Sequence, residues 1–327
     1  MSEGLVVVCG AGGFIGGHLV RDLLEQGRPV RGIDIKPLDE WEQLHSSAEN
    51  LSLDLSQHAN CLEGISGATQ VYQLAADMGG IGFIEAHKAE CMLSVLINTH
   101  ALMAAKHHGV GEFFYSSSAC VYAADKQRDA HVTALKEEDA YPAMPEDGYG
   151  WEKLFSERMC RHFREDYGMK TRVARYHNVY GPLGTWQGGR EKAPAAISRK
   201  VAFAKLTGKH EIEIWGDGEQ TRSFMYIDDC IVGTQKIFAS ETDEPLNLGS
   251  AELVTVNELV DLVEEFAGIK LLRSYKTDAP VGVRGRNSDN TRIQQQLGWT
   301  PSVSLRDGME KTYAWVFDQV KAELDTK

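Results

Sequence analysis

Tyr149 and Lys153 are the residues of this chain whose types and spacing suggest chemistry most directly. Four positions apart, they lie on one face if the segment is a helix. A phenol that exchanges a proton with a hydroxyl group, beside an ammonium that stabilises the phenolate, can assist the oxidation of an alcohol. Ser118, near the end of a predicted strand, could hydrogen-bond to the same hydroxyl. These three residues predict redox chemistry on an alcohol, with a nicotinamide to take the hydride.

Cys120 adds a thiol that hydride transfer does not require. It follows Ser118 by two positions, so both side chains would point to one face if the strand continued through them. The pKa of a free thiol is about 8.5, and nearby cations lower it. Although a lone cysteine is more often a small core residue, one beside a Tyr/Lys pair indicates that oxidation is followed by acid–base chemistry at carbon.

A glycine-rich turn separates the first predicted strand, 5–9, from the first predicted helix, 18–26. Glycines there allow the pyrophosphate of a dinucleotide to approach the helix N-terminus, whose free N–H groups attract anions. Asp34, ending the second strand, can accept hydrogen bonds from ribose hydroxyls and would repel a 2′-phosphate, which favours NAD over NADP. Asp54, after the third strand, is expected to contact the adenine. The residues of the predicted NAD turn are Gly10, Gly12, Gly13, Phe14, Ile15 and Gly16.

The order of predicted elements indicates an α/β fold. Continuous apolar runs, typical of parallel strands covered on both faces, alternate with helical patterns. Such βα units predict a Rossmann-type, doubly wound parallel sheet with right-handed crossovers. We expect this NAD-binding domain to span 1–177 and to include about 225–250. The strands are predicted at 5–9, 30–34, 51–54, 71–75, 113–117, 171–176 and 246–249, and the helices at 18–26, 91–108 and 149–167.

The pattern changes after Asn178. Residues 180–190 are rich in glycine and aromatic residues, which is typical of a loop. The remainder predicts a smaller mixed α/β lobe, made of 178–224 and 251–327, that binds the substrate. Its helices are predicted at 193–207 and 256–267, and its strands at 211–215 and 271–275.

The composition of the chain limits the kinds of partner that it can bind. The 327 residues include 34 basic and 47 acidic side chains, for a net charge of −13. This balance argues against general affinity for nucleic acid or anionic membranes, so an anionic substrate needs a local cluster of cations. Six scattered cysteines form neither a disulfide framework nor a zinc pattern, and no metal site is expected. No segment has the pattern of a signal peptide or of a membrane span, which makes the cytoplasm the default location.

Several conspicuous residues are expected to have no chemical role. The histidines at 87, 107, 108 and 177 have no partners at metal-like spacing. The acidic run 137–139 is predicted to be a solvated turn. Trp41, Trp151 and Trp315 are interpreted as packing residues.

The chain resembles the extended short-chain dehydrogenase/reductases of the NAD-dependent epimerase/dehydratase family, which act on nucleotide sugars. Within this group it is most similar to the GDP-mannose 3,5-epimerases, and the resemblance covers nearly its whole length. Four long and unusual strings carry the closer match: DMGGIGF at 77–83, SSAC at 117–120, GTWQGGREKAPAA at 184–196 and GVRGRNSDN at 282–290.

The resemblance implies a specific reaction. Oxidation of the C4′ hydroxyl of GDP-mannose acidifies the hydrogens at C3′ and C5′, and inversion of either carbon needs a base on one face of the ring and an acid on the other. In the family these groups are a cysteine and a lysine, which correspond to Cys120 and Lys192. The implied product is GDP-L-galactose, with GDP-L-gulose from a single C5′ inversion. A homodimer is also implied, through a helix pair that includes 91–108 and 149–167.

The resemblance also implies the substrate-binding residues. Arg222, Arg286 and Lys200 are candidates for the diphosphate, because a guanidinium suits bidentate contact with phosphate oxygens. Asn178 would hydrogen-bond to the diphosphate or the sugar, and Gly79 would let the backbone approach the hexose. The implied set is Gly79, Ser118, Cys120, Asn178, Glu191, Lys192, Ala193, Lys200, Gln220, Arg222 and Arg286.

Two other functions stay open. A nucleotide-sugar 4-epimerase needs no thiol or lysine for chemistry at carbon, and a 4,6-dehydratase usually has an Asp–Glu pair where this chain has Ala119–Cys120. A non-catalytic dinucleotide-sensing protein could use the same fold, but Tyr149 and Lys153 are both retained. The division of base and acid roles between Cys120 and Lys192 also stays open.

Overall fold

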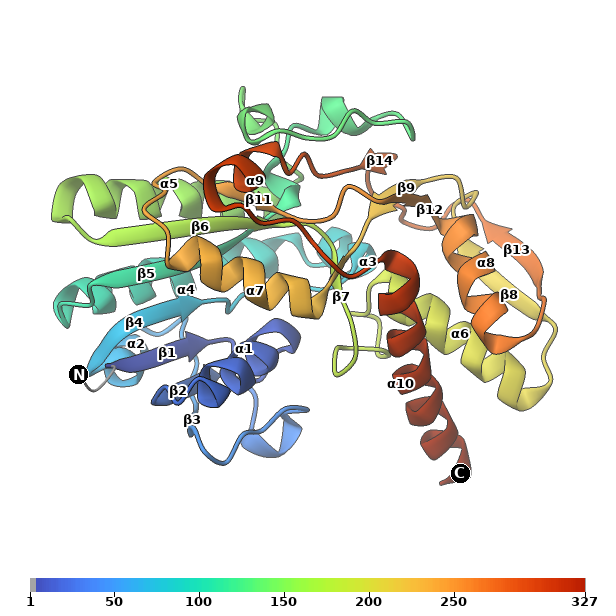
Figure 1. The fold of residues 1–327 in the computed structure, drawn as a ribbon, viewed down its shortest axis with the longest axis horizontal. Helices are drawn as coiled ribbons and strands as arrows, with labels where there is room; N and C mark the ends of the chain where they lie inside the picture. Colours follow the sequence, from blue (N-terminus) through green and yellow to red (C-terminus); the bar gives the residue numbers. More distant parts are fainter. Residues whose placement is uncertain (1–3, 327) are drawn as a thin grey trace.

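Seven parallel strands form the central sheet in a computed structural model that describes residues 4–326 (Figure 1). The strand order is β11-β6-β5-β4-β1-β2-β3. The sheet extends from β1 on both sides, toward β3 in one direction and toward β11 in the other, which is the doubly wound arrangement. The predicted α/β fold class is therefore confirmed. The strands are β1 (Leu5–Cys9), β2 (Val30–Asp34), β3 (Glu49–Ser52), β4 (Ala68–Gln73), β5 (Glu112–Ser118), β6 (Lys170–Tyr176) and β11 (Leu246–Leu248).

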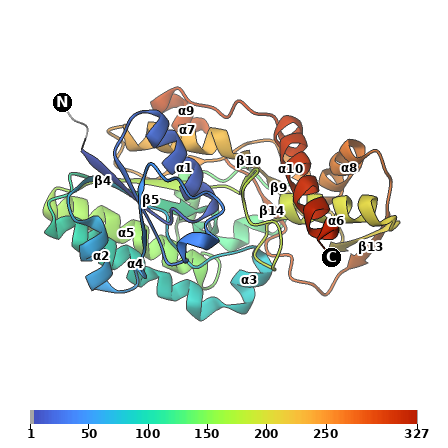
Figure 2. The same cartoon turned by 90° about the horizontal axis from the view of Figure 1, so that it is seen from below.

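Helices cover both faces of this sheet (Figure 2). Side chains alternate along β1, where Val6 and Val8 enter one apolar core while Val7 and Cys9 enter the other. This double burial explains why the strand is a continuous apolar run. One face carries α1 (Phe14–Glu25) and α7 (Ile227–Phe238), and the other carries α2 (His58–Ile65), α4 (Lys88–His107) and α5 (Tyr149–Tyr167).

A second group of elements lies beyond the carboxyl ends of the strands (Figure 1). Helices α6 (Ala193–Thr207) and α10 (Leu305–Asp325) pack together, and α8 (Val256–Ala267) lies against both. Strand β9 (Thr221–Ser223) pairs antiparallel with β12 (Leu253–Thr255) and parallel with β14 (Gly285–Arg286), while β8 (Glu211–Trp215) pairs with β13 (Leu272–Lys276). The remaining elements are α3 (Ile81–Ala86), α9 (Thr291–Leu297), the pair β7 (Val179–Tyr180) and β10 (Met225–Tyr226), and 3₁₀ turns at Leu38–Glu40, Ala119–Val121, Ala124–Gln127 and Glu137–Ala140.

Strand β5 ends at Ser118, one residue after its predicted end, so Cys120 lies in a 3₁₀ turn and does not share a strand face with Ser118.

Other local expectations are wrong. Helix α1 begins at Phe14, four residues before the predicted start, because Gly13 is already its N-cap. Glu137 is buried, not solvated, because its carboxylate accepts a hydrogen bond from the backbone N–H of Asn247 at 3.0 Å. Trp151 is 44% exposed on α5, whereas Trp41 is buried as expected.

Residues 4–326 contain no helix that is long and apolar enough to cross a membrane. The same residues place no group of three or more His, Cys, Asp or Glu side chains where they could hold a metal ion. All six cysteines are free and buried.

Candidate active site

The glycine-rich turn leads from β1 into α1 through positions that exclude larger residues. Gly10 has φ +86°, and a Cβ there would lie 2.9 Å from the backbone nitrogen of Ala75. A Cβ on Gly16 would lie 2.0 Å from the carbonyl oxygen of Gly10, so α1 packs directly on the turn. Because the N-cap is Gly13, no cap side chain competes with an anion at this helix N-terminus.

Further groups of the predicted NAD site flank this turn. Asp34 is buried at the end of β2, and its carboxylate accepts a hydrogen bond from the backbone N–H of Lys36 at 3.1 Å. The Lys36 ammonium donates to the carbonyl of Gly12 at 3.1 Å. Asp54 accepts a hydrogen bond from the backbone N–H of Ser56 at 2.9 Å. The turn, the open helix end and the buried carboxylate fit NAD.

Phe14 and Ile15, the first residues of α1, are half-buried against the core. The Phe14 ring lies beside Gly184, where a Cβ would be only 3.2 Å from it. The start of α1 is thus packed against the loop that leads to Lys192.

Tyr149 and Lys153 are buried on the first two turns of α5. The Lys153 ammonium donates to the carbonyl of Ser116 at 3.0 Å and lies 5.4 Å from the centre of the Tyr149 ring. Burial raises the pKa of Tyr149, as do the nearby Cys120 and Glu152, while a hydrogen bond with Ser118 acts in the opposite direction. The structure therefore brings Ser118, Tyr149 and Lys153 together, with the phenol protonated at neutral pH.

Cys120 lies directly beside this group. Its backbone N–H donates to the Ser118 hydroxyl at 3.2 Å, which caps the 3₁₀ turn. Its carbonyl is so close to α5 that a Cβ on Gly150 would lie 2.3 Å from it. The glycine after Tyr149 thus allows thiol and phenol to face one space.

That space is a cavity of about 330 Å³ between the sheet and the second group of elements. It is lined by every residue that the resemblance implied for substrate binding, and Tyr149 joins them. The lining contributed by predicted residues is Gly79, Ser118, Cys120, Tyr149, Asn178, Glu191, Lys192, Ala193, Lys200, Gln220, Arg222 and Arg286. The part that each of them plays stays a prediction.

Lys192 is the N-cap of α6. Burial lowers the pKa of its ammonium, although the nearby thiols of Cys120 and Cys230 act in the opposite direction. The position at a helix N-terminus also disfavours a positive charge. An amine that loses its proton more easily is suited to act as base as well as acid.

Two loops meet beside Lys192. The backbone N–H of Gly80 donates to the carbonyl of Arg190 at 2.9 Å, and the Arg190 guanidinium bonds to Asp77 at 2.7 Å. A Cβ on Gly80 would lie 2.5 Å from the carbonyl oxygen of Glu191, and one on Gly79 would lie 2.8 Å from Cβ of Phe83. Gly79 is therefore required by the fold of its own loop.

Arg222 and Arg286 lie side by side, because their strands pair with these two residues in register. The Arg222 guanidinium donates only to backbone carbonyls, at 2.6–3.1 Å, and no ion pair joins it to a carboxylate in the described part of the chain. Burial lowers its pKa to about 10. A half-buried cation with no acidic partner is suited to an anionic ligand. Arg286 is different, since its guanidinium lies 3.6 Å from the Cys120 sulfur.

The other predicted substrate residues have these partners. The Lys200 ammonium donates to the carbonyl of Glu213 at 2.8 Å, and Asn178 donates to the carbonyl of Ser223 at 3.0 Å. Glu191 pairs with Arg199 at 2.8 Å, and Ala193 is the first residue of α6.

Gln220 is the predicted residue with an unused hydrogen-bonding group. Its amide nitrogen donates to the carbonyl of Trp215 at 2.8 Å. Its buried Oε1 accepts no hydrogen bond from any residue between 4 and 326, so a ligand N–H can bind there.

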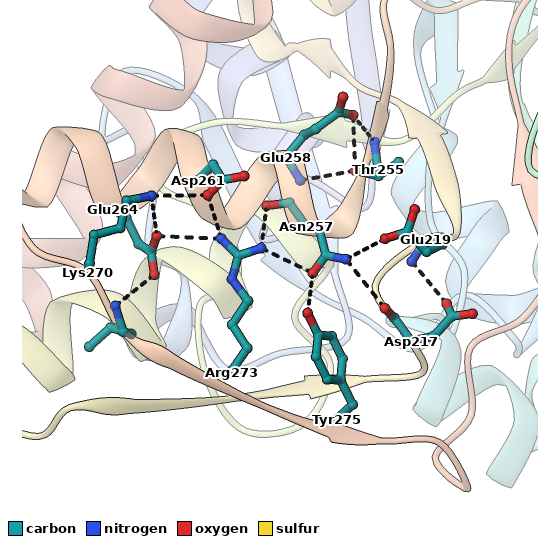
Figure 3. A network of polar contacts seen from close by, with 11 residues as sticks. Asp217, Glu219, Thr255, Asn257, Glu258, Asp261, Glu264, Lys270, Arg273 and Tyr275 are labelled. Carbon is teal, nitrogen blue, oxygen red and sulfur yellow. Dashed lines mark hydrogen bonds and ion pairs between the residues drawn. The ribbon is translucent and has the colours of Figure 1, made fainter.

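A network of polar contacts between α8, β13 and the turn before β9 holds the turn that carries Gln220 (Figure 3). Asn257, in the first turn of α8, donates to Glu219 at 2.7 Å and accepts from Arg273 and Tyr275 at 3.2 and 3.1 Å. Arg273 also bonds to Asp261 at 2.6 Å. The network ties α8 and β13 to the turn before β9, so it positions both Gln220 and Arg222.

Glu146 was missed by the sequence analysis, although it lines the cavity and pairs with Arg286. Gln127 and Trp215 were also missed: Gln127 accepts a hydrogen bond from the distant Arg286, and Trp215 lines the cavity. For Glu146, the only sequence signal is a position three residues before Tyr149.

A family model matches residues 6–249 of the chain. The chain belongs to the NAD dependent epimerase/dehydratase family. It is 44% identical to GDP-mannose 3,5-epimerase 1 of Oryza sativa subsp. japonica over 97% of the chain and 83% of that protein.

Solved structures of two nucleotide-sugar epimerases have the same fold. The UDP-glucose 4-epimerase of Thermotoga maritima superposes with a TM-score of 0.86 at 26% identity, over 97% and 99% of the two chains. The UDP-glucuronic acid 4-epimerase of Bacillus cereus, in complex with UDP-glucuronic acid and NAD, gives 0.82 at 25%, over 96% and 99%. The expected family, the NAD cofactor and the isomerase class are thereby confirmed.

Proposed function

We propose that this isomerase converts GDP-mannose to GDP-L-galactose by inverting C3′ and C5′, with GDP-L-gulose as the product of a single C5′ inversion. The observation that supports this most is the shared cavity of Cys120 and Lys192, next to Tyr149. Neither the thiol nor the lysine is needed for an exchange confined to C4′. The identity of 44% to a GDP-mannose 3,5-epimerase supports the same substrate.

Tyr149 would take the proton from the C4′ hydroxyl, while Ser118 hydrogen-bonds to the same oxygen. NAD, when bound, supplies the acceptor for the C4′ hydride and returns it at the end of the turnover. Burial opposes ionisation of the phenol, so the positive charge of Lys153 is needed to favour the phenolate. The resulting C4′ ketone acidifies the hydrogens on both neighbouring carbons.

Cys120 and Lys192 would then perform the inversions. At each carbon one group removes a proton and the other returns a proton to the opposite face. Cys120 extends from the sheet side of the cavity and Lys192 from the start of α6, so they come from different elements. Tyr149 finally returns its proton to the C4′ oxygen as the ketone is reduced.

The nucleotide would be bound at the other end of the cavity. Arg222, which has no acidic partner among residues 4–326, is suited to the diphosphate, with Lys200 and Asn178 nearby in the lining. The free Oε1 of Gln220 can accept a hydrogen bond from the N–H groups of guanine.

The decisive experiment is incubation of the protein with GDP-mannose in heavy water. We expect deuterium at C5′ and C3′ of the recovered sugar nucleotides, read by NMR, because each inversion returns a solvent proton. Absence of deuterium at both carbons would overturn the proposal. Inversion at C4′ alone, without deuterium, would indicate a 4-epimerase instead.

We also propose that the protein is a homodimer. Large apolar side chains are exposed on the adjacent helices α4 and α5: Met92 at 47%, Leu93 at 59%, Leu96 at 39%, Trp151 at 44% and Phe155 at 52%. A second copy that packs its own α4 and α5 on this face would bury them. The cytoplasmic location and the domain boundaries at 177, 225 and 250 stay predictions.

A further inference from the structure

Glu146 is a charged residue of the cavity to which the proposed reaction gives no role. It lies just before α5, and its backbone N–H donates to the carbonyl of Cys120 at 3.0 Å. Its carboxylate, with a side chain only 14% exposed, forms an ion pair with Arg286. Backbone and side chain together place Glu146 beside the thiol.

Arg286 connects the carboxylate to the sulfur. Its Nε donates to Gln127 at 2.7 Å, and Nη1 lies 3.6 Å from Sγ of Cys120. Its side chain is 7% exposed, so little solvent screens these charges. The other titratable or charged groups that interact with Cys120 come from three further elements, and they are Tyr149, Lys192 and Arg222.

The charges of Glu146 and Arg286 act on the thiol in opposite directions. A buried guanidinium in contact with sulfur favours the thiolate, whereas a carboxylate paired with that guanidinium offsets its charge. A thiolate held permanently by an arginine could take a proton but would seldom give one. Inversion at two carbons requires a cavity in which a proton is also returned.

We propose that Glu146 is a positioning residue that pairs with Arg286 and offsets its positive charge, so that the side chain of Cys120 can both donate and accept a proton. The purpose that this inference gives to Glu146, proton transfer by Cys120, rests on the proposed function. The coupling of the three side chains, however, can be measured on the free protein without any substrate.

The experiment is alkylation of Cys120 by iodoacetamide across a pH series, with the modified peptide quantified by mass spectrometry. In Glu146→Gln the guanidinium is unpaired, and we expect the pH of half-maximal alkylation to fall by about one unit, within the range that neighbouring cations produce. In Arg286→Gln the carboxylate is unpaired, and the midpoint should rise. If both variants keep the wild-type midpoint, the proposal is overturned.

Glu138→Gln is the matched control, because Glu138 is 63% exposed, pairs with Arg292 and does not line the cavity. Like Glu146→Gln, this variant removes one negative charge, but it should leave the pH of half-maximal alkylation of Cys120 unchanged. If the midpoint shifted equally in this control, the net charge of the protein alone would explain the effect, and the proposal would be contradicted. If deuterium exchange with GDP-mannose fails while the midpoints move in opposite directions, the proposed reaction is wrong and the role of Glu146 stands.

Discussion

The Ser118 hydroxyl joins the two groups to which the proposed reaction gives proton transfer. It interacts with Tyr149 and also accepts a hydrogen bond from the backbone N–H of Cys120. In the proposed reaction, oxidation at C4′ and proton transfer at the neighbouring carbons would therefore take place beside each other.

Cys120→Ala should separate the two kinds of chemistry. Tyr149 and Lys153 remain, so NAD should still be reduced by GDP-mannose, as followed by the absorbance of NADH. Deuterium incorporation at C3′ and C5′ should fall by about 10²–10⁴-fold, the usual contribution of a general acid or base. Cys61→Ala is the control, since Cys61 is a buried residue of α2 and does not line the cavity. Undiminished deuterium at both carbons in Cys120→Ala would remove the thiol from the mechanism.

Residues that are alike in sequence acquire different roles because of distant partners. Arg222 and Arg286 were both predicted to hold the diphosphate, yet only Arg286 contacts a thiol and a carboxylate. Glu137 and Glu146 are both acidic residues outside the α-helices and strands, and their burial depends on Asn247 and Arg286, which are more than one hundred positions away. Neighbouring sequence carries no signal for such pairs.

Helices α4 and α5 have two functions at the element scale. The inner face of α5 buries Tyr149 and Lys153 against β5, while its outer face exposes Trp151 and Phe155. Helix α4 packs beside it. Dimerisation on this surface would buttress the helix that carries the redox pair.

Leu93→Glu should convert the protein to a monomer, because a charge would be placed in the centre of the exposed apolar surface of α4. We expect the mass measured by light scattering after size-exclusion chromatography to fall from two chains to one. Leu272→Glu is the control, since Leu272 is 75% exposed on β13 in the other part of the molecule. If the wild-type protein already elutes as a monomer, the proposed interface is wrong.

At the scale of the whole molecule, the parts set by local pattern could be predicted from the sequence. The apolar strands and the glycine turn follow from double burial and from steric limits at Gly10 and Gly16. The 3₁₀ turn at Cys120 could not be predicted, because it is fixed by contact with Gly150 on α5.

Burial of His177 beside the central sheet makes the free energy of unfolding depend on pH. It is fully buried between the Tyr122 ring and Asn247, with Nε2 3.0 Å from the side-chain oxygen Oδ1 of Asn247. Burial lowers the pKa of its imidazole to about 4; the hydrogen bond to Asn247 opposes this shift and the charge of Arg175 adds to it. In the unfolded chain the value is about 6.5.

Between pH 6.5 and 4 the unfolded chain therefore binds a proton that the folded protein does not. The free energy of unfolding should fall with pH across this window, by about 2–3 kcal/mol at pH 4.5 for this residue. Denaturant unfolding of the wild type and of His177→Gln at pH 7 and 4.5 measures the effect. His177→Gln should be less stable at pH 7, because its site is fully packed, but should lose less stability on acidification. Equal losses in the two proteins would show that His177 is not the group that titrates.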